Sequence, residues 1–354
     1  MSVNLKRYLE SESVKTSAPC RIDMGGTLDI STFYYPLRHL NPSTFNIAID
    51  LRTHVRLLPY DAPVVKVSST GFADAEYPVD SAPFDHPMGL IFAIAAYFQA
   101  EGVHIRIDST SPPRSGLGGS SVAAVALIAA FSNVLTRIGV SRQLYRREIA
   151  ILAHALEESV AGVPCGLQDQ LAAAYGGINA WRWHGRVKEA VFEKDAIFRK
   201  SALQDFENHL LLAYCGIPHE SKNINQSWVK AFISGNNRDR WAEIIHCTQK
   251  FTDALKRQDI QDAVEAMNRE TLIRKEMTPE VMDVTADRLA DAAREEGCGA
   301  RFTGAGGGGC MWALGQTAHI DRLRDVWEKI LTERQDARLL DVKIDSDGLL
   351  YSCR

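Results

Sequence analysis

The stretch SPPRSGLGGSSVAAVALIAA, residues 111–130, joins a glycine- and serine-rich segment directly to a run of Ala, Val, Leu and Ile. The residues before it, VHIRID (103–108), alternate between apolar and polar side chains, which is typical of a half-buried strand. The pattern predicts a strand, a loop and a buried helix, in that order. The apolar run at 122–131 is about half of the ~20 residues that a membrane-spanning helix needs, so we expect a core helix.

The loop has the composition of an anion-binding turn. The first amides of a helix lack partners inside the helix, and glycines let further backbone N–H groups converge on one anion. Phosphate is a natural occupant of such a turn. The loop has no Gly-Lys-Ser/Thr sequence and no G-x-G-x-x-G, so it is neither a P-loop nor a dinucleotide fingerprint. A turn that only caps the buried helix is the alternative.

Composition limits the class of protein. The chain has 354 residues, of which 45% are hydrophobic and 24% charged, so we expect a globular protein of two domains. The formal net charge of −4 argues against nucleic acid or a membrane as a partner. The seven cysteines are scattered and form no Cys-x-x-Cys pair, which argues against zinc and disulfides and favours the cytoplasm.

The chain mixes helical and strand patterns in both halves. Strands are expected at 44–61 and 62–70, as part of an antiparallel sheet, and helices at 86–102 and at 141–162, the latter capped by Ser141 and closed by Gly162. Long charged helices follow at 239–258 and 281–297, and a strand, glycine loop and strand at 299–315. No regular strand–helix alternation is present. We therefore predict an α+β protein with domains at 1–200 and 201–354.

Three further stretches carry candidate site residues. TGAGGGGC (303–310) has five glycines, which suggests close approach of the backbone to a ligand or to another chain segment. APCRIDMGGTLD (18–29) places charged side chains around a glycine break, and HALEESVAGVPCGLQDQ (154–170) has Glu157, Glu158 and Asp169. Taken singly, each charge fits a solvated helix face or a surface turn.

Together the four stretches resemble the GHMP kinases, the superfamily of galactokinase, homoserine kinase, mevalonate kinase and phosphomevalonate kinase. APCRID resembles the first motif of the superfamily, PPRSGLGGSSVAA the second and FTGAGGGGC the third, in the same order. GLQDQLAAAYGGINAW (166–181) is similar to heptose 7-phosphate kinases and other sugar kinases. The resemblance implies an N-terminal domain like domain 2 of ribosomal protein S5, a ferredoxin-like C-terminal domain, and a cleft between them for ATP and the acceptor.

The resemblance also implies roles for individual residues. Asp169 would accept the proton of the acceptor hydroxyl, with Arg21 beside it as the second catalytic residue. Ser120 and Glu158, which lies eleven residues before Asp169, would bind Mg²⁺. The ATP-binding residues would be Pro113, Ser115, Gly116, Leu117, Gly118, Gly119, Ser120 and Ser121 of the second motif, with Gly306 and Gly307 of the third.

The acceptor end departs from the sugar-kinase pattern. Those kinases place a sugar-binding Asp nine positions after their Arg, whereas Asp29 follows Arg21 by eight and Leu28 precedes it. We expect Gly26, Thr27 and Asp29 to bind the acceptor, with Asp23 as the alternative to Asp29. The positions of the basic side chains Arg52, Arg114 and Lys222 bear on whether the acceptor already carries a phosphate.

The expected function is that of a cytoplasmic kinase that uses ATP and Mg²⁺. It would transfer the γ-phosphate to a hydroxyl of a small-molecule sugar or sugar phosphate, as a heptose 7-phosphate kinase or a galactokinase does. A mevalonate kinase-like enzyme and a non-catalytic, metabolite-binding regulator of the same fold are the alternatives. A homodimer is left open.

Overall fold

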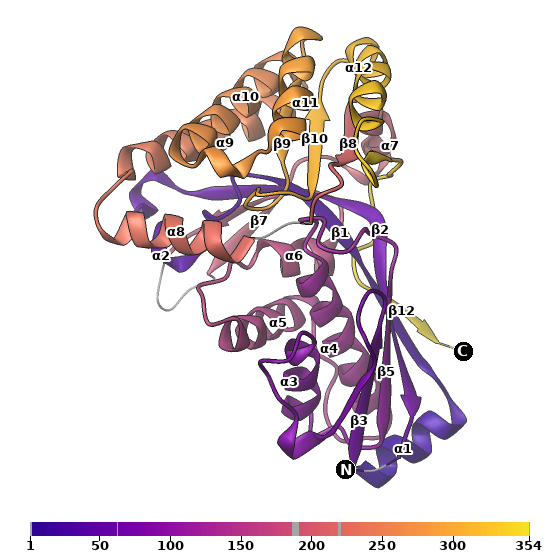
Figure 1. The fold of residues 1–354 in the computed structure, drawn as a ribbon. Helices are drawn as coiled ribbons and strands as arrows, with labels where there is room; N and C mark the ends of the chain where they lie inside the picture. Colours follow the sequence, from indigo (N-terminus) through magenta and orange to yellow (C-terminus); the bar gives the residue numbers. More distant parts are fainter. Residues whose placement is uncertain (1, 62, 186–190, 219–220, 354) are drawn as a thin grey trace.

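The computed structural model describes residues 2–61, 63–185, 191–218 and 221–353, and contains two sheets (Figure 1). In the first, the strand order is β12-β1-β2-β5-β3-β4, and β6 and β7 extend the sheet from β2. The strands are β1 Val14–Met24, β2 Ser43–Pro59, β3 Val64–Ser69, β4 Ala75–Pro78, β5 Val103–Ser109, β6 Ile178–Trp183, β7 Phe192–Ala196 and β12 Leu350–Cys353.

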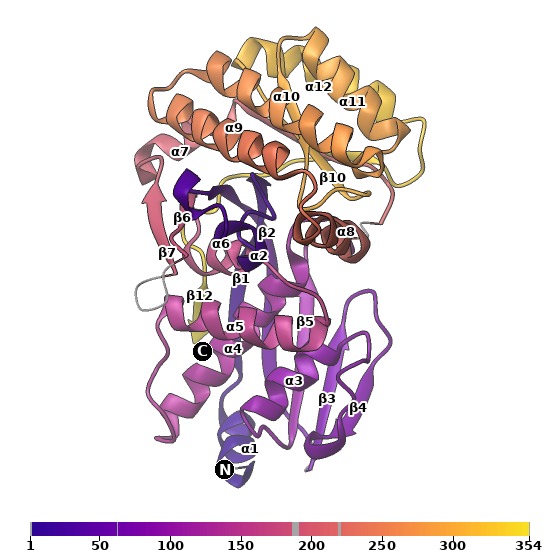
Figure 2. The ribbon, with the colours of Figure 1, turned by 90° about the vertical axis from the view of Figure 1, so that its left-hand side faces the viewer.

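Helices cover one face of this sheet (Figures 1 and 2). They are α3 Gly89–Tyr97, α4 Gly119–Arg137, α5 Arg146–Ala161 and α6 Gln168–Tyr175, and α1 Ser2–Ser11 packs against β2 and α4. The central helix, α4, is long and apolar enough to cross a membrane, but 78% of its apolar window is buried inside the protein. It packs against β1, β2, α5 and α6, which confirms the predicted order of strand, loop and core helix.

The second sheet has the order β11-β8-β10-β9 and lies with the C-terminal helices in the upper lobe of Figure 1. Its strands are β8 Leu210–Tyr214, β9 Gly299–Phe302, β10 Cys310–Leu314 and β11 Arg338–Leu340. The remaining helices are α2 Ser31–Tyr34, α7 Leu203–Glu207, α8 Ser221–Ile233, α9 Arg238–Lys256, α10 Ile260–Met277, α11 Val284–Glu295 and α12 Thr317–Leu331, with 3-10 turns η1 Arg38–Leu40, η2 Val79–Ser81, η3 Lys200–Ala202 and η4 Pro279–Val281.

The α+β class is confirmed, and two local expectations are wrong. Strand β3 pairs in parallel with β5, not only in antiparallel fashion, because α3 carries the chain back between them. Helix α5 begins at Arg146 rather than after Ser141: Glu148 accepts a hydrogen bond from the Tyr145 N–H, and Tyr145 takes the N-cap position. Its end at Gly162, with φ 69°, is as expected.

The end of the chain returns to the first sheet. After the second sheet is complete, β12 pairs antiparallel with β1. The Asp345 N–H donates to the Ala48 carbonyl, and the Asp345 carbonyl accepts from the Gly177 N–H. The boundary expected at residues 200/201 falls within η3, between β7 of the first sheet and β8 of the second. The division into 1–200 and 201–354 stays a prediction.

Candidate active site

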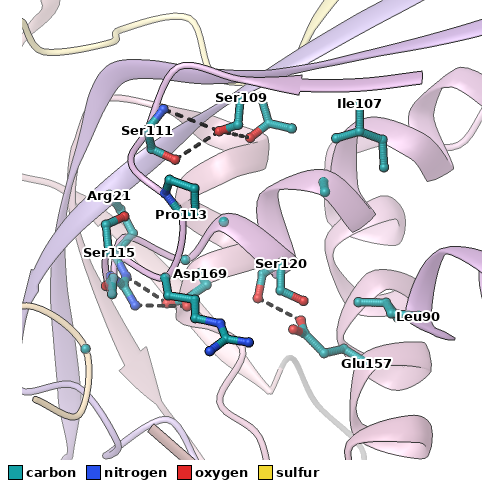
Figure 3. Close-up of a pocket in the computed structure, with 18 of the residues that line it drawn as sticks. Arg21, Leu90, Ile107, Ser109, Ser111, Pro113, Ser115, Ser120, Glu157 and Asp169 are labelled. Atoms are coloured by element: carbon teal, nitrogen blue, oxygen red, sulfur yellow. Dashed lines mark hydrogen bonds and ion pairs between the residues drawn. The ribbon is translucent and has the colours of Figure 1, made fainter. Parts of the chain in front are cut away.

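A cavity of about 570 Å³ is lined by residues of both halves of the chain. Its wall combines β1, the loop at 111–119, the first turn of α4, and residues of α5, α6 and α8 with Gly304 and Ala305 from the loop after β9. Figure 3 shows part of the cavity, where Arg21 and Asp169 are joined by hydrogen bonds and lie close to Pro113 and Ser115. Segments that are distant in the sequence therefore converge on one site.

The glycine and serine loop adopts the shape of an anion cradle. Gly116 and Gly118 have φ of 75° and 80°, a left-handed conformation that glycine adopts without strain, and Gly118 is the N-cap of α4. A Cβ built on Gly119 would meet no atom within 4 Å, so this residue borders open space. The free amides of the first turn of α4 thus face a cavity large enough for a phosphate.

Not every residue of this loop faces the cavity. Pro113, Ser115, Gly116, Gly118, Gly119, Ser120 and Ser121 line it, whereas the Leu117 side chain is 1% exposed and belongs to the core. The Leu117 carbonyl accepts a hydrogen bond from the Arg21 amide at 3.2 Å. Leu117 therefore anchors the loop to β1, and its expected contact with ATP stays a prediction.

The far end of the cavity is apolar. Met88, Leu90, Ile91 and Ile107 line it, and Phe72, whose side chain is partly exposed, closes its edge. These residues come from β5, the loop after β3 and the start of α3. Such a wall suits a flat heterocyclic base better than a charged group.

Arg21 and Asp169 form a two-point ion pair at the centre of the cavity. Arg21 Nε lies 2.8 Å from Asp169 Oδ1 and Nη2 lies 2.9 Å from Oδ2, while Nη1 donates to the Gly116 carbonyl at 2.6 Å. Burial acts to lower the pKa of Arg21, but the charges of Asp169 and Asp23 outweigh it, so the pKa is raised and the guanidinium stays charged. The Asp169 side chain remains 21% exposed toward the cavity.

A purely structural role for Asp169, as the N-terminal cap of α6, does not match its position. Asp169 lies inside the first turn of α6, and the N-cap position is taken by Leu167. The Asp169 carboxylate is committed to Arg21 instead.

The structure places Glu157, not Glu158, in the cavity. Glu157 Oε2 accepts hydrogen bonds from Ser121 Oγ at 2.7 Å and from Gln170 Nε2 at 2.8 Å, whereas Glu158 is exposed and does not line the cavity. Successive residues of a helix point about 100° apart, so the side chains of Glu157 and Glu158 leave α5 in different directions. Burial raises the pKa of Glu157, and the Ser121 and Ser120 hydroxyls oppose that rise.

Asp29 lies in the cavity wall with one carboxylate oxygen unsatisfied. The side chain is 4% exposed; Oδ2 accepts a hydrogen bond from the Gln168 amide at 2.9 Å, and Oδ1 has no partner among the described residues. Gly166 lies so close that an added Cβ would be 1.8 Å from Oδ2. Burial raises the pKa of Asp29 to about 6, although the Gln168 hydrogen bond opposes the shift.

The neighbouring residues differ from expectation in two places. Thr27 lines the cavity, but Gly26 does not, because the Asp23 and Gln168 side chains cover it: an added Cβ would lie 2.5 Å from Asp23 Oδ2. Asp23 is fully buried and accepts hydrogen bonds from the Gly304 amide and from Arg301. It is therefore a structural carboxylate and not a substitute for Asp29.

The second glycine cluster serves mainly to bring chain segments together. Within the described structure, Gly304 and Ala305 are the residues of this loop that line the cavity; Gly306 and Gly307 do not. The Gly307 amide donates to the Val281 carbonyl at 2.9 Å, and a Cβ on Gly306 would lie 2.5 Å from the same oxygen. Gly306 and Gly307 thus pack closely against the Val281 backbone outside the cavity lining, and their expected contact with ATP stays a prediction.

The basic side chains named from the sequence lie in different places. Arg114 lines the cavity beside the phosphate loop. Arg52 lies outside the cavity lining, where it pairs with Asp345 and donates to the Ser17 and Gly348 carbonyls. The Lys222 side chain lies outside the described residues.

Some site residues had no sequence signal. Asn225 lines the cavity from α8, and the buried Arg274 and Arg301 contact the loops around it. None of the three belongs to a motif. Their position at the site depends on how the C-terminal helices pack over β1, which local sequence patterns do not report.

Comparisons with known proteins agree with this geometry. The family model described as GHMP kinases N terminal domain matches residues 87–177, and GHMP kinases C terminal matches residues 251–332. The D-glycero-alpha-D-manno-heptose 7-phosphate kinase of Campylobacter jejuni is 24% identical over 312 residues, covering 85% of this chain and 89% of the relative. A mevalonate kinase of Pyrococcus horikoshii is 26% identical over 298 residues, covering 75% and 80%. The structure of Lactococcus lactis galactokinase complexed with galactose superposes with a TM-score of 0.71 at 18% identity, covering 99% of both chains.

Proposed function

We propose that this chain, which belongs to the GHMP kinases, transfers the γ-phosphate of ATP to a hydroxyl of a sugar or sugar phosphate. The observation that carries the proposal is the Arg21–Asp169 ion pair, which lies between the phosphate loop and the hydrogen-bonding groups around Asp29. A phosphoryl donor on one side and a hydroxyl acceptor on the other would meet at this pair.

The donor side fits a nucleoside triphosphate. The adenine ring would occupy the apolar end near Leu90 and Ile107, and the triphosphate would lie against the amides of residues 115–121. The cradle has no P-loop lysine. Backbone amides, the dipole of α4 and the exposed Arg114 would supply positive potential in its place.

The serine and glutamate side chains fit Mg²⁺. Glu157 and the Ser120 hydroxyl are hard oxygen donors that face the phosphate cradle, and the half-buried Glu157 lacks a cationic partner among the described residues. The described residues hold no cluster of three or more carboxylate, His or Cys ligands, so phosphate oxygens and waters would complete the coordination shell. When bound, Mg²⁺ would neutralise charge on the phosphates.

The residues of this chain can carry out the transfer in one step. The acceptor hydroxyl donates its proton to an Asp169 oxygen as its own oxygen bonds to the γ-phosphorus, and the bond from that phosphorus to the bridging oxygen breaks to release ADP. Arg21 holds the Asp169 carboxylate by two hydrogen bonds and leaves lone pairs free to receive the proton. The Asp29 Oδ1 atom would accept a hydrogen bond from a second acceptor hydroxyl.

Mevalonate is the second candidate acceptor, because the mevalonate kinase relative is about as similar as the heptose 7-phosphate kinase. The direct test is ADP release from Mg²⁺-ATP with a panel of hexoses, heptoses, heptose phosphates and mevalonate. We expect turnover with a sugar or sugar phosphate. Turnover with mevalonate alone would replace the proposed acceptor, and ligand binding without turnover of any panel member would indicate a non-catalytic regulator.

A further inference from the structure

Arg274 is a buried cation that lies behind the acceptor end of the cavity. Its side chain on α10 is 0% exposed; Nε donates to Glu270 Oε1 at 2.7 Å, and the guanidinium carbon lies 5.0 and 5.1 Å from the ring centres of Trp228 and Trp241. Burying a charge is costly unless it is paired and hydrogen-bonded. Glu270 is shared with Arg301, and Arg274 contacts it through Nε. The Nη1 and Nη2 groups of Arg274 are therefore left to bond to other groups.

Those donors reach the loop that precedes Asp29. Arg274 Nη2 donates to the Gly26 carbonyl at 2.5 Å, and Nη1 lies 3.4 Å from Thr27 Oγ1. Thr27 has φ 78°, a left-handed conformation that is rare for a β-branched residue and persists only where the surroundings impose it. Arg274 is hydrogen-bonded to the carbonyl of Gly26, the residue before Thr27, so it can stabilise this conformation of Thr27.

The position of Thr27 in turn orients the Asn225 side chain. The Thr27 hydroxyl donates to Asn225 Oδ1 at 3.4 Å, and both side chains line the cavity. Because Oδ1 faces Thr27, the amide NH₂ of Asn225 is left without a hydrogen-bond acceptor among the described residues. Asn225 and Trp228 are one turn apart on α8, and Trp228 packs on Arg274, so the same cation also fixes the helix that carries Asn225.

We propose that Asn225 binds the acceptor through its NH₂ group and that Arg274 is a positioning residue that orients it through Thr27. This inference rests on the proposed kinase reaction and adds a donor to the acceptor end, where Asp29 Oδ1 supplies an unsatisfied hydrogen-bond acceptor. A hydroxyl both donates and accepts hydrogen bonds. The Asn225–Asp29 combination therefore selects a polyol with two hydroxyls near the one that is phosphorylated.

The test measures the Michaelis constants for the acceptor and for ATP separately, with the panel member that the wild type phosphorylates fastest. Asn225→Asp keeps the shape and the oxygen that faces Thr27 but loses the donor. We expect the KM for the acceptor to rise about tenfold, as for the loss of one hydrogen bond, while the KM for ATP stays within about twofold. Gln226→Glu makes the same chemical change on the exposed side of α8 and should alter neither constant.

The positioning role has its own variants. Arg274→Lys keeps the charge beside Glu270 but loses the planar fork, and should raise the KM for the acceptor selectively, whereas Arg269→Lys on the exposed face of α10 should not. A structural role alone would lower the melting temperature without this selective change.

The outcomes separate the two proposals. A wild type that phosphorylates no panel member overturns the proposed function, and this inference with it. An active wild type with an unchanged KM for the acceptor in folded Asn225→Asp overturns the inference alone. If Arg274→Lys does not fold, the decision rests on Asn225→Asp and on Thr27→Val. The valine keeps the β-branched shape but removes the hydroxyl that contacts Asn225 and Arg274. An unchanged acceptor KM in both variants overturns the proposal.

Discussion

Arg21 and Asp169 are 148 positions apart in the chain, and their side chains meet in a two-point ion pair with N–O distances of 2.8 and 2.9 Å. The pair joins β1 to the first turn of α6 directly below the phosphate loop, because the Arg21 guanidinium also donates to the Gly116 carbonyl. One arginine therefore holds both the carboxylate that we propose as the catalytic base and the loop that would hold the phosphoryl donor.

The two adjacent glutamates of α5 provide a matched pair of variants for the magnesium site. Glu157→Gln removes the carboxylate that faces Ser121, and we expect it to raise the Mg²⁺ concentration needed for half-maximal rate by about tenfold or more, as for one lost charged ligand. Glu158→Gln changes an exposed residue and should leave the requirement as it is. Magnesium titrations of ATP turnover check both, and equal effects of the two changes would refute the assignment of Glu157.

The two glycine loops should respond differently to a side chain. Gly119→Val fills open space in the cavity, so we expect at least ~10-fold weaker nucleotide binding with little change in melting temperature. Gly306→Ala would force a Cβ against the Val281 carbonyl at positive φ, so we expect a loss of roughly 1–3 kcal/mol in stability and unchanged nucleotide affinity of the folded protein. Calorimetric nucleotide binding and thermal melts give the two readouts; the reverse pattern would contradict the placement of these loops.

We expect the titration of Asp29 to make the stability of the fold depend on pH. Its pKa is raised from 3.8 to about 6, so between these values the folded state is protonated while the unfolded state is not. Stability conferred by this group is then greatest at low pH and falls as the pH rises from about 4 to 6, by about 3 kcal/mol in all. Asp29→Asn should remove that slope and gain stability relative to the wild type at pH 7.5, as measured by denaturant unfolding at both ends of the range.

Acceptor binding should show the opposite dependence on pH. A hydroxyl that donates to Asp29 Oδ1 stabilises the ionised carboxylate, so the affinity of the wild type for the acceptor should weaken as the pH falls below about 6. In Asp29→Asn the affinity should be weaker throughout, and its change across pH 6 should disappear. A wild-type acceptor affinity that is constant from pH 5 to 8 would show that Asp29 does not contact the acceptor.

Local patterns were sufficient for those parts of the site that a single segment builds. The segment 103–130 has an alternating strand, two glycines at positive φ and a continuous apolar helix, and the structure has β5, the loop and α4 in that order. Motif spacing also brought Arg21 and Asp169 together correctly. In contrast, motif spacing predicted Glu158 as the Mg²⁺ ligand, whereas Glu157 lines the cavity. A spacing along the sequence does not show which side of α5 faces the cavity.

Contacts between distant segments were beyond the reach of such patterns. Glycine composition left open whether the 303–310 segment approaches a ligand or another chain segment, and the family resemblance implied that Gly306 and Gly307 contact ATP. In the structure both residues pack against Val281. Asn225 and Arg274 have no motif at all, and their roles depend on how α8 and α10 pack over the loop after β1. The return of β12 to the first sheet likewise depends on tertiary structure, since its pairing with β1 joins the two ends of the chain.

The substitution Asp169→Asn tests the central claim most directly. Asparagine keeps the shape of the side chain and can still accept one hydrogen bond from Arg21, but it cannot take a proton from the acceptor hydroxyl. General-base catalysis contributes typically ~10²–10⁴-fold in rate, so we predict at least a ~100-fold loss of turnover number. The melting temperature and the affinity for ATP should stay close to those of the wild type. A near-normal turnover number in this folded, ATP-binding variant would contradict the role of Asp169 as the catalytic base.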